Sequence, residues 1–397
     1  MSPEYRKVAG TRRILTMVSD STDLIYLDFN ATTPILPEVL EVMLPYFRDD
    51  FGNPSSDHPK GARARDGVEA ARCQVATLIG ASPSEIIFTS CATESSNLAI
   101  RGVAATRSQP GRIVTSTIEH PASSQPCTAL EGSGWSVTRV GPRSNGIVHP
   151  DDVQSSLGPD AALVTLIHAH NEIGTIQPIG EIAERAHAVG AVVHTDAAQS
   201  VGKIPVSVEA LQVDLLTIAG HKLYAPKGVG ALYVRRGTAI RPVLQGGGQE
   251  HGLRPGTENV AFMVALGRAC ELAGERLAAR ENRVRVLRDE LWQRLKAAIP
   301  DLELNGDVEH RLPNTLSVRF PKVSGSELLA ATKELAASTG SACHAGELRP
   351  PDVVMQLGIE AARALGTVRL SLGIPTTREQ IVRAATALTA AWKRLAL

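Results

Sequence analysis

The stretch TIAGHKLYAPKG, residues 217–228, brings a lysine to the point where an apolar strand is expected to end. The strand predicted at its start runs out into Gly220, His221 and Lys222. An amine at such a strand end is poorly hydrated, so its pKa should fall and its nitrogen should become available for a Schiff base. A lysine on the surface at a strand end is the alternative explanation of the same pattern.

The segments around this stretch alternate between strand-like and helix-like patterns. Short β-rich runs end in polar or glycine-containing turns and lead into helical segments, which is typical of a largely parallel sheet with crossover helices. The predicted strands are 85–89, 112–116, 163–168, 191–195, 215–218 and 231–235, and the predicted helices are 94–107, 120–131 and 179–189. The sequence therefore predicts an α/β fold.

A change of composition near Glu271 predicts the start of a second domain. A long charged helix is expected from there, and it includes RLAARENRVRVLRDELWQRLKAAIP, residues 276–300. Its apolar residues recur at three and four positions and a proline ends it. The second domain is expected to continue through LPNTLSVRF, a further helix, a cysteine-containing loop and a closing helix from Thr377.

The composition is that of an ordinary soluble globular protein. The chain has 397 residues, of which 43% are hydrophobic and 21% charged, enough for two domains. Lysine plus arginine total 41 and aspartate plus glutamate total 41, so no overall charge favours nucleic acid, a membrane surface or an acidic partner. We therefore expect neither nucleic-acid nor membrane partners.

The cysteines and the N-terminus predict a cytoplasmic protein. Five cysteines are widely spaced without a Cys-x-x-Cys pair, which fits a reducing compartment. No apolar run approaches the roughly 18 residues of a membrane helix, and the N-terminus lacks the apolar core of a signal peptide. Residues 1–24 are expected to form an N-terminal arm.

Polar residues follow a second predicted strand in VVHTDAAQS, residues 192–200. Ligands of doubly wound sheets bind at the carboxyl ends of the strands, so Asp196 and Lys222 are expected to face one cleft. A carboxylate there could pair with a pyridinium nitrogen, the partner that lets pyridoxal phosphate act as an electron sink. Gln199 follows at helical spacing. The alternative is that Asp196 only caps a helix.

Two further strand ends could serve the same cleft. In FTSCATESSN, residues 88–97, Thr93 lies among small residues before a helix whose free amides can bind a phosphate. In STIEHP, residues 116–121, His120 could lie over an aromatic ring or carry protons. The alternatives are a plain helix cap for Thr93 and a hydrogen-bonded turn residue for His120.

The segment IHAHNEIG, residues 167–174, contains His168 and His170. Zinc requires three or four ligands with supporting groups, and no companion set is evident, so no metal site is predicted. Asn171 follows the same strand and could donate to a cofactor oxygen or a substrate carboxylate.

The C-terminal part supplies an arginine and a cysteine. Arg369 lies between apolar neighbours in GTVRLSLG, and its planar fork suits an α-carboxylate, with a structural ion pair as the alternative. Cys343 lies in STGSACHAG, residues 338–346, among small residues and next to a histidine. A reactive thiol favours such a setting, and an incidental thiol in a loop is the alternative.

The motifs together resemble one family. DFNATTP, FGNPSS, CATES, IEHP, HNEIG, HTDAAQS, GHK, RPGTEN, LPN, the cysteine segment and VRLSLG occur in the order found in cysteine desulfurases and selenocysteine lyases, from about residue 26 to the C-terminus. The resemblance implies an aspartate-aminotransferase-like (fold type I pyridoxal phosphate) enzyme with a mainly parallel central sheet and a smaller α+β domain. It implies a homodimer, with a small domain formed by 25–37 and 266–397 and a large cofactor-binding domain over 38–265.

The resemblance also implies roles for the site residues. Lys222 corresponds to the Schiff-base lysine, and Cys343 to the nucleophile that takes sulfur or selenium from the substrate and leaves alanine. Asp196 corresponds to the partner of the pyridinium nitrogen, Gln199 to the donor to the ring hydroxyl, and His120 to the acid/base that stacks on the ring. The phosphate contacts correspond to Thr93 and His221, with Thr257 contributed by the other subunit. Asn171 and Arg369 correspond to the residues that bind the substrate carboxylate.

The predicted function is a cysteine desulfurase that supplies sulfur for iron–sulfur clusters or thio-cofactors through a protein acceptor. Ala219 and His344 depart from the residues of many desulfurases and are similar to those of selenocysteine lyases, which makes a selenocysteine lyase the main alternative. An aminotransferase of the same fold would not need Cys343. A noncatalytic sulfur-relay scaffold would lack the bound cofactor.

Overall fold

The computed structural model describes residues 24–340 and 349–397. The predicted N-terminal arm, apart from Leu24, lies outside the described residues. The predicted nucleophile Cys343 and its neighbour His344 also lie outside them.

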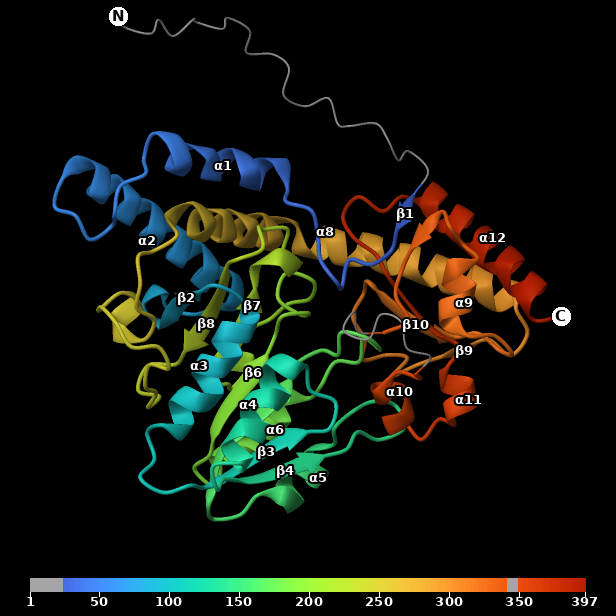
Figure 1. The fold of residues 1–397 in the computed structure, drawn as a ribbon, viewed down its shortest axis with the longest axis horizontal. Coiled ribbons are helices and arrows are strands. Elements are labelled where there is room, and N and C mark those ends of the chain that lie inside the picture. The colour runs from blue at the N-terminus through green and yellow to red at the C-terminus, as the bar shows by residue number, and fades with distance from the viewer. Residues whose placement is uncertain (1–23, 341–348) are drawn as a thin grey trace, which may run out of the picture.

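A seven-stranded sheet forms the centre of the larger part of the molecule (Figure 1). Its order is β2-β8-β7-β6-β5-β3-β4, and β8 is the antiparallel strand among parallel neighbours. The strands are β2 (Ile86–Thr89), β3 (Arg112–Ser116), β4 (Ser136–Val140), β5 (Ala161–Ile167), β6 (Val192–Asp196), β7 (Leu215–Ala219) and β8 (Gly230–Val234). The predicted α/β fold with a mainly parallel sheet is confirmed.

Helices cover both faces of this sheet because its buried strands are apolar on both sides. The helices of this part are α1 (Pro37–Arg48), α2 (Pro59–Ile79), α3 (Ala92–Ala104), α4 (Pro121–Glu131), α5 (Pro150–Ser156), α6 (Ile179–His187) and α7 (Val208–Leu211). On one face Ile87 packs with α3 residues such as Leu98. On the other face Phe88 belongs to the cluster formed by α1, α2, α6 and the start of α8.

The sequence analysis missed the edge strand β4 and the helices α1 and α2. The β4 sequence SVTRV is half-exposed and polar, so it carries no buried apolar run. The two helices pack mainly on α8, with α1 outside α2 (Figure 1). Because α8 lies far from α1 and α2 in the sequence, the local pattern of residues does not reveal that these helices pack on it.

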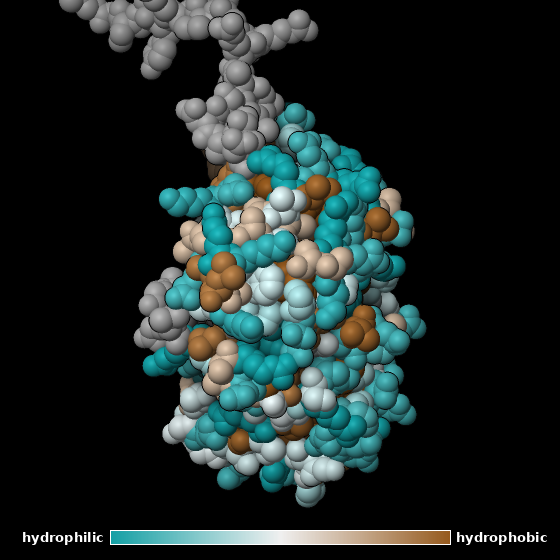
Figure 2. All heavy atoms as spheres, turned by 90° about the vertical axis from the view of Figure 1, so that its right-hand side faces the viewer, coloured by the Kyte–Doolittle hydropathy of each residue, from teal (hydrophilic) through white to brown (hydrophobic). Residues whose placement is uncertain are grey.

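A second part is built around a three-stranded antiparallel sheet of order β12-β10-β9. Its elements are β9 (Glu303–Leu304), β10 (Thr315–Arg319), β12 (Thr367–Ser371), α9 (Gly325–Ala330), α10 (Asp352–Gln356), α11 (Ala361–Ala364) and α12 (Arg378–Leu395), together with the pair β1 (Ile25–Tyr26) and β11 (Leu335–Ala336). Most of these elements share a separate apolar core, whereas buried residues of α10 and α11, such as Val353 and Ala364, belong to the core of the larger part. On the outer face of this second part the hydrophobic residues are scattered among hydrophilic ones (Figure 2).

The long helix α8 (Val260–Ala298) runs through both parts (Figure 1). Its start near residue 271 was predicted wrongly, because the segment before it is apolar and small and shows no charged face. A Cβ on Gly267 would lie 2.5 Å from Cα of Ala71, so α8 and α2 touch backbone to backbone. Since α8 contributes to both cores, the domain division at residue 266 stays a prediction.

Candidate active site

A cavity of about 280 Å³ opens at the carboxyl ends of the central strands. Parallel strands bring the residues that follow them to one edge of the sheet, which is where ligands of such folds bind. Eight of the ten predicted site residues line this cavity: Thr93, His120, Asn171, Asp196, Gln199, His221, Lys222 and Arg369. Thr257 is exposed and does not line it, and Cys343 lies outside the described residues.

Lys222 ends the short 3-10 helix Gly220–Lys222 that follows β7. Its Nζ donates to the backbone carbonyls of Asn30 and Ala31, at 2.7 Å for the latter. Burial, with the nearby charge of Arg369, lowers the Lys222 pKa to about 8. The amine is therefore half-buried and partly unprotonated near neutral pH, as the sequence pattern predicts for a nucleophilic lysine.

Asp196 lies at the end of β6 and is 4% exposed. Burial raises its pKa, while the charges of His120 and Lys222 favour its ionised form. Its Oδ1 accepts from the backbone N–H of Ala198 at 2.9 Å, so the residue stabilises the turn as well as facing the cavity. No helix follows Asp196, so it does not cap one, and its pairing with a pyridinium nitrogen stays a prediction.

His120 is the N-cap of α4. Pro121 starts that helix without an N–H, and the next amide, of Ala122, donates to His120 Nδ1 at 3.1 Å. This bond assigns the proton of the neutral ring to Nε2. Burial lowers the His120 pKa, so the ring is neutral near pH 7 and can exchange a proton on its cavity side.

The amides at the start of α3, beside Thr93, are placed where they could bind an anion. The N-cap, Cys91, makes no side-chain cap, and Thr93 lies inside the first turn, so the proposed plain cap by Thr93 is wrong. The first amides of a helix without a cap are available to an anion. A Cβ on Gly230 would lie 2.8 Å from the Cys91 carbonyl carbon, so glycine lets β8 support this turn.

His221 lies next to Lys222 on the same side of the cavity. Its Nδ1 is 3.1 Å from Oγ1 of Thr32. Burial and the nearby lysines lower its pKa to about 4, so the ring is neutral and can donate one hydrogen bond.

Arg369 lies on β12 and is 2% exposed. Its Nη2 donates to Asp28 Oδ1 at 2.7 Å and its Nη1 to the Asn171 carbonyl at 3.0 Å. Nε is buried and has no hydrogen-bond partner among the described residues. Arg369 therefore makes the structural ion pair and also presents a guanidinium to the cavity.

The two histidines considered for a metal have structural contacts. His168 Nδ1 lies 2.8 Å from Ser200 Oγ, and His170 Nδ1 accepts from the Glu172 amide at 3.1 Å. Burial lowers their pKa values to about 4 and 3. Within residues 24–340 and 349–397, no group of three or more His, Cys, Asp or Glu side chains could hold a metal ion.

Among the same residues, no helix is long and apolar enough to span a bilayer.

The sequence analysis missed Asn30, Asp28 and Lys203. Asn30 and Asp28 lie in the quoted motif DFNATTP, but no role followed from the motif itself. Asn30 donates to Thr315 Oγ1 at 2.8 Å and to the Asn171 carbonyl at 3.1 Å, so it joins the two parts of the molecule at the cavity wall. The signal that could have found Asp28 and Asn30 is a polar cluster in an otherwise buried segment.

Known proteins resemble this chain along most of its length. Residues 25–383 match the family described as Aminotransferase class-V. The chain is 46% identical over 362 residues to a cysteine desulfurase of Nostoc sp., covering 91% of this chain and 90% of that protein. It is 44% identical over 360 residues to the cysteine desulfurase IscS of Dictyoglomus turgidum, covering 90% and 91%.

Solved structures agree with these relatives. A NifS-like protein, 37% identical, superposes with a TM-score of 0.88 and covers 94% of this chain and 100% of its own. A structure described as SspA in complex with cysteine, 36% identical, superposes with a TM-score of 0.78 and covers 87% of this chain and 98% of its own.

The chain therefore belongs to the aminotransferase class-V family, whose enzymes depend on pyridoxal phosphate. Within that family it groups with the cysteine desulfurases, as the ordered motifs predict.

The residues around the cavity fit that cofactor. Lys222 supplies an amine of lowered pKa for an aldehyde, and Asp196 supplies a buried carboxylate for a ring nitrogen. The uncapped amides beside Thr93 suit a phosphate.

Proposed function

We propose that the protein converts L-cysteine to L-alanine and keeps the sulfur as a persulfide on Cys343, for transfer to a protein acceptor that serves iron–sulfur cluster or thio-cofactor assembly. The observation that carries the proposal is the convergence of Lys222, Asp196 and His120 on one cavity in a chain whose relatives are named cysteine desulfurases. A cytoplasmic location belongs to the same proposal, and the free thiols of Cys73, Cys91, Cys127 and Cys270 support it.

The cofactor would be held by residues of three kinds. Lys222 would attach it covalently, Asp196 would pair with its ring nitrogen, and His120 would contact its ring. Gln199 would donate to the ring oxygen, while Thr93 and His221 would bind the phosphate together with Thr257 of the partner subunit. When bound, the cofactor supplies an electron sink for the substrate carbanion.

The substrate carboxylate would bind between Arg369 and Asn171. The Arg369 Nη atoms are already used by Asp28 and Asn171, which fixes the plane of the guanidinium. Arg369 and Asn171 both line the cavity, so the guanidinium is a cationic partner available to a substrate carboxylate. The arginine thus orients the amino acid with its α-carbon toward Lys222.

Lys222 and His120 carry the protons. A Lys222 amine with a pKa of about 8 can take the α-proton of the substrate and return a proton later, because both protonation states are accessible near neutral pH. His120 has its proton on Nε2, since Nδ1 accepts from Ala122. It is therefore the donor available from the opposite side of the site.

The sulfur step is assigned to Cys343 from the sequence. The Cys343 thiolate attacks the substrate sulfur, a sulfur–sulfur bond forms, and the bond between that sulfur and the substrate β-carbon breaks. The carbon fragment keeps the electron pair of the broken bond and takes up a proton before it leaves as alanine. The persulfide stays on the enzyme until an acceptor thiol takes the outer sulfur.

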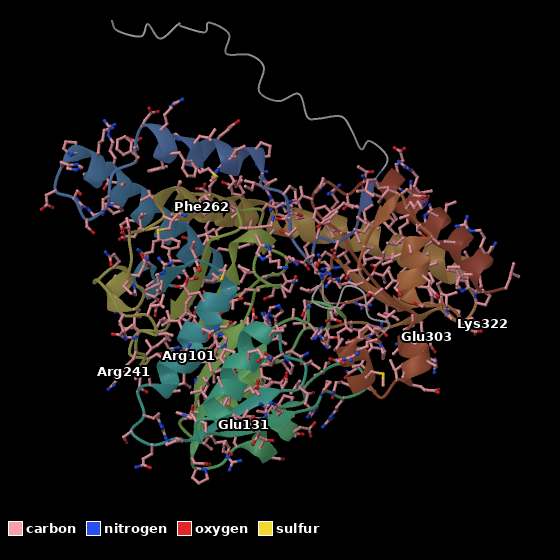
Figure 3. All side chains as sticks on the ribbon, viewed as in Figure 1. Arg101, Glu131, Arg241, Phe262, Glu303 and Lys322 are labelled. Carbon is pink, nitrogen blue, oxygen red and sulfur yellow. The ribbon has the colours of Figure 1, made fainter. Side chains whose placement is uncertain are left out.

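The homodimer is part of the same proposal. Thr257 is exposed and lies outside its own cavity, which suits a contact made in the other subunit. The α1 side chains Leu40, Leu44 and Phe47 are 44%, 52% and 57% exposed and share one helix face. Phe47 packs edge-on against Phe262 at 6.2 Å between ring centres. Phe262 lies at the start of α8 (Figure 3). This apolar face supports a subunit contact.

Parallel assays with L-cysteine and L-selenocysteine test the function. We expect alanine release from L-cysteine at a kcat/KM equal to or above that for L-selenocysteine, and its loss in Cys343→Ala. The exposed Cys73 gives a matched control, because Cys73→Ala should leave turnover unchanged. Strong selectivity for selenocysteine would instead assign a selenocysteine lyase, and retained alanine release from cysteine in Cys343→Ala would contradict the persulfide step.

A further inference from the structure

A second lysine, Lys203, lies behind the cavity and has no role in the reaction described above. It lies four positions after Gln199, and its half-buried side chain lines a separate small cavity of about 50 Å³ between the two parts of the molecule. Lys222 lines both this small cavity and the active-site cavity, whereas Lys203 lines only the small one. Lys203 is therefore close to the reacting lysine without reaching the place of the substrate.

Lys203 Nζ contacts two side-chain oxygens. It donates to Gln199 Oε1 at 2.5 Å and to Asn30 Oδ1 at 2.9 Å. Nζ donates one N–H to each of these oxygens, so the atom of Gln199 that faces it is the carbonyl oxygen. The contact with Lys203 thereby favours one orientation of the Gln199 amide.

The Gln199 nitrogen consequently faces the opposite way. One of its N–H groups donates to the Asn30 carbonyl at 3.0 Å, and that same carbonyl accepts from Lys222 Nζ. The second N–H is left for a group in the cavity, which Gln199 lines. In the reversed orientation the Gln199 oxygen would face the Asn30 carbonyl, and two acceptors would repel each other.

Asn30 cannot turn to accommodate a reversed Gln199. Its Oδ1 accepts from Lys203 and from Asn314 Nδ2 at 2.9 Å, and its Nδ2 donates to Thr315 and to the Asn171 carbonyl. Both ends of the Asn30 amide are thus satisfied in one orientation. These hydrogen bonds link Lys203 to Gln199 at the cavity wall and hold the Gln199 amide in one orientation.

The contacts of Lys203 suit an uncharged amine. Nζ meets two acceptors among the described residues, and a neutral amine has two N–H groups whereas an ammonium has three. Burial and the nearby charges of Lys222 and Arg369 lower the pKa of Lys203 well below its ordinary value. Lys203 can therefore hold Gln199 without adding a full positive charge beside Lys222.

We infer that Lys203 is a positioning residue, which holds the Gln199 amide with its nitrogen toward the cavity so that this nitrogen donates to the ring oxygen of the cofactor. The inference rests on the proposed pyridoxal phosphate site. In that site Lys203 would orient Gln199, one of the residues that donate a hydrogen bond to the cofactor.

The test follows the absorbance of the substrate-free holoenzyme from acid to alkaline pH. A hydrogen-bond donor to the ring oxygen of the cofactor stabilises the anionic form of that oxygen. Loss of the donor should therefore raise the pH midpoint of the absorbance change by about one unit. We expect this shift in Lys203→Met and in Gln199→Leu. The double variant should show the shift of one change and not of both, because Lys203 acts through Gln199. Lys333→Met, at an exposed lysine far along the chain, is the matched control and should leave the midpoint unchanged.

Other outcomes overturn the inference. An unshifted midpoint in Lys203→Met, or additive shifts in the double variant, would show that Lys203 does not act through Gln199. Loss of bound cofactor from a Lys203→Met protein with unchanged circular dichroism would assign the lysine to cofactor retention instead. Absence of cofactor absorbance in the unaltered protein would overturn the proposed function itself, which keeps the two failures distinct.

Discussion

Arg72 and Glu250 form a buried ion pair with two parallel hydrogen bonds, at 2.8 and 2.9 Å. Each residue is 5% exposed, and Glu250 also accepts from the Phe88 amide in β2. The pair fixes the segment that leads to Thr257 against the edge of the central sheet. The loop that we propose to reach a second subunit is thus held by a contact inside its own chain.

Removal of one member of this pair should destabilise the fold. In Glu250→Ala the guanidinium of Arg72 loses its buried counter-charge and keeps only the exposed Glu69, and we expect the free energy of unfolding to fall by about 3–5 kcal/mol. Urea unfolding measures this change. The exposed pair Arg48 and Asp49 provides the control, since Asp49→Ala should leave the unfolding midpoint where it is. Equal effects of the two substitutions would contradict a special role for the buried pair.

Cofactor capture by the cofactor-free protein should depend on pH through Lys222. The attacking amine has to be unprotonated, and its pKa is about 8. The rate of covalent capture should rise about tenfold per pH unit well below that value and level off above it. Stopped-flow absorbance would record it. The exposed Lys227 is the control, because Lys227→Met should keep the profile. A flat rate between pH 6 and 9 would rule out this titration.

Glu119 should make stability fall as the pH rises. Burial raises its pKa to about 8 in the folded protein, above its ordinary value of 4.5, so the folded state binds the proton more tightly than the unfolded state. The associated stability is present at low pH and is lost between about pH 4.5 and 8. Glu119→Gln should therefore be more stable than the unaltered protein at pH 8, by about 2–4 kcal/mol, with little difference at pH 4.5.

Urea unfolding at several pH values measures the Glu119 effect. Glu131→Gln serves as a control at an exposed carboxylate paired with Arg139, and its curve should run parallel to that of the unaltered protein above pH 5. If the curve of Glu119→Gln also ran parallel across the whole range, Glu119 would be ionised in the folded protein and the predicted linkage would fail.

Gly230 should be needed for retention of the cofactor. In Gly230→Ala the new Cβ would lie 2.8 Å from the Cys91 carbonyl carbon and 3.1 Å from the Ala92 nitrogen, so the first turn of α3 has to move. We expect the cofactor dissociation constant to rise about tenfold, the loss of one well-placed hydrogen bond to an anion. Equilibrium titration of the cofactor measures it. Gly248→Ala meets no atom within 4 Å and should bind as before.

Much of the fold could be predicted because its signals are local. The strands β5 and β7 are buried throughout and β6 is buried except at Val192, and each leads into polar residues that reach the cavity. The start of α8 could not be predicted, because its first turns are small and apolar on the side that meets α2. Their helical state depends on a partner that lies far earlier in the chain.

The same distinction applies to the site. Lys222, Asp196 and His120 could be proposed from single segments, because strand ends of a parallel sheet meet at one edge. The partners of these residues could not. Arg369 bonds Asp28 across 341 positions and Lys203 bonds Asn30 across 173, so no local pattern contains either contact.

The sequence by itself determined the class of fold, the family and the order of the chemical groups along the chain, because periodicity and motif spacing are properties of neighbouring residues. Only the tertiary structure decided which groups face one another and in what state. The orientation of Gln199, the lowered pKa of Lys222 and the burial of Glu119 depend on desolvation and on hydrogen bonds from distant segments, which exist only once the chain has folded.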